Sequence, residues 1–269
     1  MESVTIDDVK KIRLPQRGSH KGQNGRLLVI GGSHLFHAAS LWALTVASRI
    51  VDLAHYSSVP ENNAIVHEEK KEFRNGIVVP RGELGPYIEE DDCILIGPGM
   101  TRDAETETIT NTLLTKYPDK QWVIDAGSLQ MMDCTKIPKH AILTPHHAEF
   151  AHAFGSVDVA DVAQKYQCIV LLKGEKDIAC GIDSSDAAAG VQCRSIAGGN
   201  PGMTKGGTGD VLAGLIAALA CKNDPFLATI AGSFINKRAG DELYKKVGPY
   251  FNATDLANEI PVVMKELLF

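Results

Sequence analysis

The sequence predicts an α/β protein in which a mostly parallel central sheet lies between two layers of helices. Short apolar runs rich in β-branched residues recur along the chain, and each ends in a glycine or a polar turn. Longer segments with apolar residues at helical spacing separate these runs. Strands that alternate with helices in this way favour a parallel sheet with helices on both faces.

Five apolar runs are predicted to be buried strands. They cover residues 26–33, 93–100, 122–128, 141–147 and 168–177. Helices are predicted between them over residues 38–51, 104–117 and 158–167. Beyond Gly207 the chain is predicted to be almost entirely helical, over residues 210–220, 225–248 and 253–268.

Glycine and polar residues stand where the predicted strands end. These residues are Gly31, Gly97, Asp125, His146 and Lys173. Ligands of parallel α/β sheets bind beyond the carboxyl ends of the strands, which meet at one edge of the sheet. We therefore expect the functional site at that edge.

Composition and charge indicate an ordinary globular protein without a nucleic-acid or membrane partner. The chain has 44% hydrophobic and 22% charged residues, and its formal net charge of -6 is unfavourable for binding a polyanion. The first residues are polar, and the longest apolar run, residues 211–221, is too short to cross a bilayer. No linker is evident, so we expect one domain over residues 1–269.

The six cysteines form neither a CxxC pair nor a metal-ligand spacing. They are Cys93, Cys134, Cys168, Cys180, Cys193 and Cys221. This pattern favours reduced and mostly buried thiols, and we therefore expect a cytoplasmic protein.

The stretch GNPGMTKGGTGDVLAG, residues 199–214, concentrates glycine just before a helical segment. Gly206, Gly207 and Gly209 let backbone N–H groups approach a ligand, and the helix that follows points its positive end at the same place. Such a loop binds anions. The acid at Asp210 suggests that a hydroxyl loses its proton there while it attacks a phosphorus atom held by the N–H groups. The alternative is a plain helix N-cap, a role that aspartate often has.

The same stretch resembles the anion-hole signature of the ribokinase-like superfamily, and its GNPGM lead-in resembles that of the ADP- or ATP-dependent NAD(P)H-hydrate dehydratases. Further blocks agree with this family in order and spacing: SHKGQNGRLLVIGGS, GPGM, DAGSL, LTPHHAEF and KGEKD. The chain contains neither a P-loop nor a GxGxxG fingerprint after the first predicted strand. The resemblance covers nearly the whole chain and implies a ribokinase-like three-layer α/β/α sandwich.

The resemblance implies a role for each matched residue. Asp210 is matched to the base that accepts the proton of the substrate hydroxyl. The loop matched to the transferring phosphoryl group is Gly207, Thr208 and Gly209. The residues matched to nucleotide binding, together with Gly209, are Lys173, Gly174, Glu175, Lys176 and Asp177. The positions matched to the pocket of the hydrated substrate, beside Asp210, are Ala39, Gly99 and His146.

The block LTPHHAEF raises the question of a metal. In the resemblance, Glu149 takes the place of the acid that orients magnesium through water, and His146 replaces an asparagine. His146, Glu149 and His152 also lie on one stripe, which makes zinc conceivable, although the i, i+4 histidine pair of zinc helices is missing. The role of His147 stays open. Lys205 either neutralises phosphate charge or is a solvated loop charge.

The resemblance implies a metabolite-repair reaction on the S-epimer of hydrated NADH or NADPH (NADHX or NADPHX). Phosphoryl transfer from ADP or ATP to the C6 hydroxyl, followed by elimination of phosphate, regenerates NADH or NADPH and releases AMP when ADP is the donor. Magnesium is the expected partner of the donor phosphates. The sequence leaves the choice between ADP and ATP open.

Two other functions fit the same signature. A small-molecule kinase acting on a vitamin precursor would keep its phosphorylated product. A non-catalytic nucleotide sensor would need neither Asp210 nor Glu149. The resemblance also implies a homo-oligomer, for example a tetramer, and a separate NAD(P)H-hydrate epimerase, because we expect no fused epimerase domain in the chain.

Overall fold

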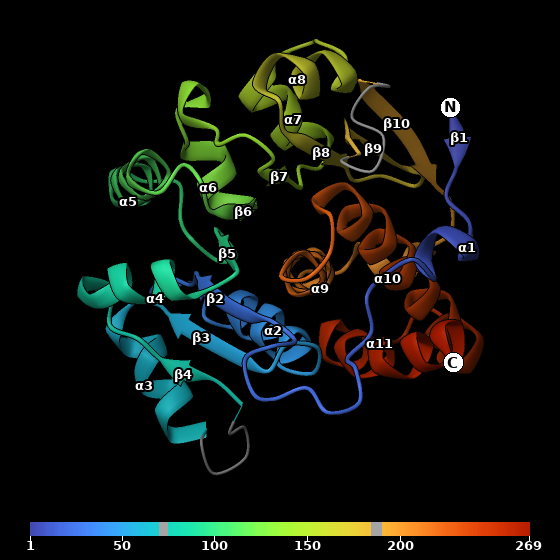
Figure 1. Cartoon of the computed structure of the whole chain (residues 1–269), viewed down its shortest axis with the longest axis horizontal. Helices are drawn as coiled ribbons and strands as arrows, with labels where there is room; N and C mark the ends of the chain where they lie inside the picture. The colour runs from blue at the N-terminus through green and yellow to red at the C-terminus, as the bar shows by residue number, and fades with distance from the viewer. Residues whose placement is uncertain (70–74, 184–189) are drawn as a thin grey trace.

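Ten strands of the described chain form one sheet, in the order β1-β10-β9-β8-β7-β6-β5-β2-β3-β4 (Figure 1). The computed structural model describes residues 1–69, 75–183 and 190–269. The strands are β1 (Glu2–Ser3), β2 (Arg26–Ile30), β3 (Leu53–Ser57), β4 (Ile77–Val78), β5 (Cys93–Ile96), β6 (Gln121–Ile124), β7 (Ile142–Leu143), β8 (Ile169–Leu172), β9 (Asp177–Ile182) and β10 (Val191–Ile196). Neighbouring strands are parallel except at the antiparallel pairs β8–β9 and β9–β10. The prediction of a mostly parallel sheet is confirmed.

Helices cover both faces of this sheet, which confirms the predicted three layers. The helices are α1 (Ile6–Val9), α2 (Ala38–Ala47), α3 (Pro60–Glu69), α4 (Leu84–Glu90), α5 (Ala104–Lys116), α6 (Ala126–Met131), α7 (His147–Phe154), α8 (Val159–Tyr166), α9 (Thr208–Ala220), α10 (Pro225–Val247) and α11 (Ala253–Leu268). α2, α9, α10 and α11 share one core with Leu27 and Val29 of β2. α4 to α8 share the other core with Leu28 and Ile30 of the same strand. Because successive side chains of a strand point to opposite faces, the continuous apolar run of β2 supplies both cores.

The predicted strands are shorter in the structure, chiefly at their carboxyl ends. The predicted strand 168–177 divides into β8 and the start of β9, and residues 173–176 form the turn between them. The sequence analysis missed β3 and the β9–β10 hairpin. β3 carries the polar residue His55 within a short run, and most residues of β10 are only partly buried, so neither shows the uninterrupted apolar pattern of a central strand.

α9 is apolar on all sides because it is buried within the molecule, near the centre of the view in Figure 1. Each residue from Val211 to Ala220 is buried. A Cβ atom at Gly214 would lie 2.5 Å from the carbonyl oxygen of Ala43 in α2, so the two helix backbones touch there. This packing holds α9 in place beneath the loop that precedes it. In the described parts of the chain, no helix is both long and apolar enough to span a membrane.

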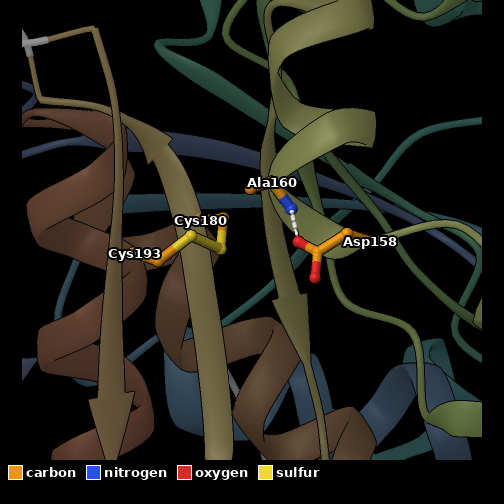
Figure 2. Close-up of a disulfide and its surroundings, with 4 residues drawn as sticks. All are labelled: Asp158, Ala160, Cys180 and Cys193. Atoms are coloured by element: carbon orange, nitrogen blue, oxygen red, sulfur yellow. Dashed lines mark hydrogen bonds between the residues drawn. A yellow bond between two sulfur atoms is a disulfide. The ribbon is translucent and has the colours of Figure 1, made fainter. Parts of the chain in front are cut away.

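A disulfide joins Cys180 of β9 to Cys193 of β10 (Figure 2). The antiparallel register places these two residues directly opposite each other. The expectation that all six thiols are reduced is therefore wrong for this pair. Their sequence separation of 13 carries no motif, and only the hairpin brings them together. The cysteine content consequently no longer supports a reducing compartment.

The other four cysteines are free thiols. Cys93, Cys168 and Cys221 are buried, as the sequence analysis expected. Burial raises the pKa of Cys168 to about 12, so its thiol stays protonated and unreactive at neutral pH.

Candidate active site

The carboxyl ends of the central strands meet at one edge of the sheet, as the sequence analysis expected. Nζ of Lys173, after β8, lies 3.1 Å from Oδ1 of Asp125, after β6. Residues His146 and Lys173 pair as an isolated parallel bridge beyond the ends of β7 and β8. Gly97, after β5, packs against Asp125 so closely that an added Cβ would lie 1.8 Å from its carbonyl oxygen. Residues from four predicted strands are therefore brought to one place.

The glycine-rich loop delivers the N-terminus of α9 to this edge. Gly207 is the N-cap residue, it adopts a left-handed backbone conformation with φ of 95°, and no side chain makes a capping hydrogen bond there. A Cβ atom at Gly207 would lie 2.4 Å from the ring of Trp42 in α2. A left-handed backbone and a bulky neighbour both require glycine at this position. The uncapped helix N-terminus can interact with an anion.

Asp210 lies in the first turn of α9, three residues after the N-cap. The N-cap interpretation of Asp210 is therefore wrong. The pKa of Asp210 is raised to about 7: burial is the largest cause, the negative charge of Asp125 also raises it, and the positive charge of Lys173 lowers it. A carboxyl group with such a pKa can accept a proton and release it again near neutral pH.

Lys173 is surrounded by carboxylates. Burial lowers the pKa of Lys173, but Asp125, Glu149 and Asp210 outweigh this effect, and the net shift is upward. A Cβ atom at Gly209 would lie 3.5 Å from Nζ of Lys173, so the ammonium group reaches the first turn of α9. This geometry places a permanent positive charge beside the helix N-terminus.

Glu149 and His146 form a capping box at the start of α7. The backbone N–H of His146 donates to Oε2 of Glu149 over 2.9 Å, and Nδ1 of His146 accepts from the backbone N–H of Glu149 over 3.2 Å. Gln130 Nε2 donates to the other oxygen, Oε1, over 3.1 Å. Both oxygens of the buried Glu149 carboxylate thus already accept hydrogen bonds, and contact with a metal through water fits them better than direct coordination.

The zinc alternative at His146, Glu149 and His152 gains no support. Within residues 1–69, 75–183 and 190–269, no three His, Cys, Asp or Glu side chains are placed to hold a metal ion together. The His146 side chain is 52% exposed, and its Nε2 lies 3.5 Å from Oε1 of Glu149.

Ala39 and Gly99, both expected in the substrate pocket, are neighbours. A Cβ atom at Gly99 would lie 3.0 Å from Cβ of Ala39 and 2.7 Å from the carbonyl oxygen of Phe36. Gly99 also has a φ of 73°, in the left-handed region. His146 follows β7, on the other side of β6 in the sheet, so a ligand that touched all three residues would span this edge.

A cavity of about 460 Å³ lies beside Lys173, between the turn after β8 and α10. Its lining residues are Lys173, Gly174, Glu175, Asp177, Gly198, Gly199, Asn200, Pro201, Met203, Thr204, Thr208, Gly209, Leu212, Asn236 and Lys237. We call it the donor cavity. It brings together most of the residues matched to nucleotide binding, but not Lys176, which is exposed and lies outside the lining.

Lys237 of α10 is a residue of this cavity that the sequence analysis missed. Its Nζ donates to the carbonyl oxygens of Gly174, Glu175 and Gly198 over 3.1, 3.1 and 3.3 Å. It also lies 3.2 Å from Oδ1 of Asp177. Lys237 therefore holds two walls of the cavity together. A lysine within the apolar stretch of α10 was the signal that could have revealed it.

Lys205 has partners within the protein that the sequence analysis did not foresee. Its Nζ donates to the carbonyl oxygens of Pro249 and Phe251, in the segment between α10 and α11. The ammonium group also lies 5.4 Å from the centre of the Phe251 ring. Lys205 thus ties the glycine-rich loop to the start of α11.

The site thus combines a mostly parallel sheet between two layers of helices with an acid, Asp210, in the first turn of a helix whose N-cap residue is Gly207. Residues 27–262 match the carbohydrate-kinase family model that is described as NAD(P)H-hydrate dehydratase. The chain belongs to this family.

Among curated relatives, the chain is 36% identical over 265 residues to the bifunctional NAD(P)H-hydrate repair enzyme Nnr of Methanocaldococcus jannaschii. The aligned region covers 96% of this chain and 52% of the relative. The chain thus spans about half the length of the bifunctional relatives it matches. It is 33% identical to the ADP-dependent (S)-NAD(P)H-hydrate dehydratase of Nitrosopumilus maritimus, over 98% of this chain and 97% of that protein.

Solved structures agree with the fold. A ribokinase-like superfamily protein from Enterococcus faecalis has a TM-score of 0.86 at 23% identity, over 99% of this chain and 96% of that chain. The ADP/ATP-dependent NAD(P)H-hydrate dehydratase from Bacillus subtilis, co-crystallised with ATP and Mg²⁺, has a TM-score of 0.83 at 23% identity, over 99% and 98% of the two chains.

Proposed function

We propose that this chain is a nucleotide-dependent dehydratase that returns the S-epimer of hydrated NADH or NADPH to the reduced cofactor. The observation that carries the proposal is Asp210, whose pKa is about 7, in the first turn of a helix with an uncapped, glycine-rich N-terminus. A phosphoryl-transfer site needs both a base for the hydroxyl and donors for the phosphoryl oxygens. The names of the Nitrosopumilus maritimus and Bacillus subtilis proteins support ADP or ATP as the donor.

In the first step, Asp210 accepts the proton of the C6 hydroxyl. At the same time the oxygen of this hydroxyl attacks the terminal phosphorus of the nucleotide. The bond from this phosphorus to the bridging oxygen breaks, and AMP leaves when ADP is the donor. N–H groups of Gly207, Thr208 and Gly209 hold the phosphoryl oxygens, and Lys173 offsets their charge. Magnesium bound to the donor phosphates would offset more of that charge, with Glu149 reaching it through water.

In the second step, the lone pair of the ring nitrogen expels the C6 phosphate, and the transfer of a proton from C5 to water restores the ring double bond. The same N–H groups stabilise the phosphate as it departs, because it carries the same charge as on arrival. One site therefore serves both steps.

The proposal also covers the domain, the compartment, the oligomeric state and the source of the substrate. We assign residues 1–269 to one dehydratase domain that acts in the cytoplasm as a homo-oligomer, for example a tetramer. An NAD(P)H-hydrate epimerase activity would supply the S-epimer. The bifunctional names of several relatives support a link between the two activities.

The test is one quenched time course with hydrated NADH, magnesium and ADP. We expect NADH, AMP and free phosphate to appear together in equal amounts. A stable phosphorylated product without NADH would instead indicate a small-molecule kinase. Nucleotide binding without any product would indicate a sensor. Repeating the course with ATP decides which donor is preferred.

A further inference from the structure

We propose that Asn236 of α10 selects adenine as the base of the phosphoryl donor, an inference that rests on the proposed function. Asn236 lines the donor cavity and is only 4% exposed. Its side-chain Oδ1 has no hydrogen-bond partner within the described residues. A buried acceptor without a partner is unfavourable, and in a cavity wall it is typical of a group that a ligand completes.

The other polar side chains of the cavity wall have partners inside the protein. Glu175 is exposed to solvent and is left aside. The polar side chains of the wall that form hydrogen bonds with other described residues are Lys173, Asp177, Asn200, Thr204, Thr208 and Lys237. Asn200 is the clearest contrast, because it is also an amide. Its Nδ2 donates to Oδ1 of Asp241 over 3.1 Å, and its Oδ1 accepts from the backbone N–H of Gly202 over 3.0 Å. Asn236 is thus the buried side chain of this wall that retains an unused acceptor.

The surroundings of Asn236 suit a flat aromatic base. Gly198 and Gly199 contribute backbone without side chains, and both have left-handed φ values, of 105° and 84°. A Cβ atom at Gly199 would lie 3.4 Å from Sδ of Met203, which is an ordinary van der Waals contact, so Met203 packs closely against this glycine. Leu212 and Pro201 add apolar surface. Apolar walls with a small number of polar groups are characteristic of ligand pockets.

The same cavity also reaches the loop proposed to hold the phosphoryl group. Thr208 and Gly209 of α9 line it, as does Lys173. One nucleotide can therefore place its terminal phosphate at the N-terminus of α9 and its base against α10.

The chemistry of the amide favours adenine. The 6-amino group of adenine can donate to Oδ1 of Asn236, while the amide N–H₂ donates to N7 of the same base. Guanine and hypoxanthine carry an oxygen at position 6. On the N7 edge these two bases therefore present two acceptors, so in either orientation of the amide Oδ1 of Asn236 faces an acceptor and neither atom has a proton to share.

The experiment is isothermal titration of the full chain with ADP and with inosine diphosphate, which has the 6-oxygen in place of the 6-amino group. No hydrated cofactor is added, so turnover does not enter the measurement. We expect wild-type protein to bind ADP about tenfold more tightly or better. Asn236→Leu, of similar volume, should bring the two affinities within about twofold of each other. Asn236→Ala serves the same purpose if the leucine variant does not fold.

Met203→Leu is the matched control, because it changes a side chain of the same cavity that carries no amide. Its ratio of ADP to inosine diphosphate affinity should equal that of wild type. Equal binding of both nucleotides by wild type, or an unchanged ratio in both Asn236 variants, would overturn the inference. If the protein converts hydrated NADH equally well with ADP and with inosine diphosphate, this inference fails while the proposed function stands. If Asn236 governs the ratio but no dehydration occurs, the proposed function fails alone.

Discussion

Lys173 Nζ lies 3.1 Å from Oδ1 of Asp125, and this ion pair lies beside the first turn of α9. Asp125 is 2% exposed and also accepts a hydrogen bond from Thr144 over 2.8 Å. The one ammonium group is thus shared among three carboxylates, those of Asp125, Glu149 and Asp210. A bound phosphoryl group would compete with them for Lys173, and weakening of the attraction to Asp210 would raise the basicity of that carboxylate.

The first prediction concerns the base. Asp210→Asn should lower kcat by about a thousandfold or more, because the variant cannot accept the hydroxyl proton. The dissociation constant of ADP should change little or decrease, since a negative charge near the phosphates is removed. Asp119→Asn, at an exposed turn before β6, is the matched control and should keep wild-type kcat. Wild-type turnover by Asp210→Asn would exclude the mechanism.

The second prediction concerns the pH dependence of stability. The pKa of Asp210 is raised to about 7, well above the ordinary value of an aspartate, so the folded state binds this proton more tightly than the unfolded state. The stabilisation from the proton is complete below the unfolded pKa and is lost as pH rises through the folded pKa. Asp210→Asn should therefore melt at a higher temperature than wild type at pH 8, and the difference should shrink towards pH 4. A difference that is constant from pH 4 to pH 8 would contradict the raised pKa.

The third prediction separates two adjacent glycines. Gly207→Ala should lower the free energy of unfolding by about 2 kcal/mol or more, because an added Cβ meets the Trp42 ring and the backbone is left-handed. At Gly206 an added Cβ has no neighbour within 4 Å. Gly206→Ala should therefore stay within about 0.5 kcal/mol of wild type. Urea unfolding of the two variants makes the comparison, and equal losses would show that the loop geometry is not as described.

The fourth prediction divides the site between its two substrates. Lys173→Ala should raise KM for the nucleotide more than KM for the hydrated cofactor, and His146→Ala should do the reverse. Lys139→Ala, an exposed lysine before β7, is the control for charge. Steady-state kinetics with each substrate varied in turn measures the two KM values of each variant, which are then compared with those of wild type. Parallel changes in both KM values would mean that the division is wrong.

The fifth prediction concerns the disulfide. It closes a loop with a sequence separation of 13. A loop of this size stabilises by about 3 kcal/mol, so a thiol reductant should lower the melting temperature by roughly 6 °C or more. The variant with both Cys180→Ser and Cys193→Ser should melt at that lower temperature with or without reductant. A reductant-insensitive wild type would show that the bond contributes nothing to stability.

The sequence by itself determined the alternating strands and helices, the edge where the site lies and the glycine-rich turn into a buried helix. These features are local. The strand runs and the all-apolar α9 are readable from neighbouring residues, because periodicity and turn chemistry act over a few positions. The functional assignment came from ordered motifs, and the roles given to individual residues, Asp210 among them, stay predictions.

Only the tertiary structure decided which distant residues meet. It placed Lys173 against Asp125, joined Cys180 to Cys193, and put Lys237 between two walls of the donor cavity. It also replaced the N-cap interpretation of Asp210 with a first-turn position and raised the pKa of its carboxyl group. Each of these facts depends on strand order and on burial. Both arise from the packing of segments far apart in the chain, which no local pattern of residues encodes.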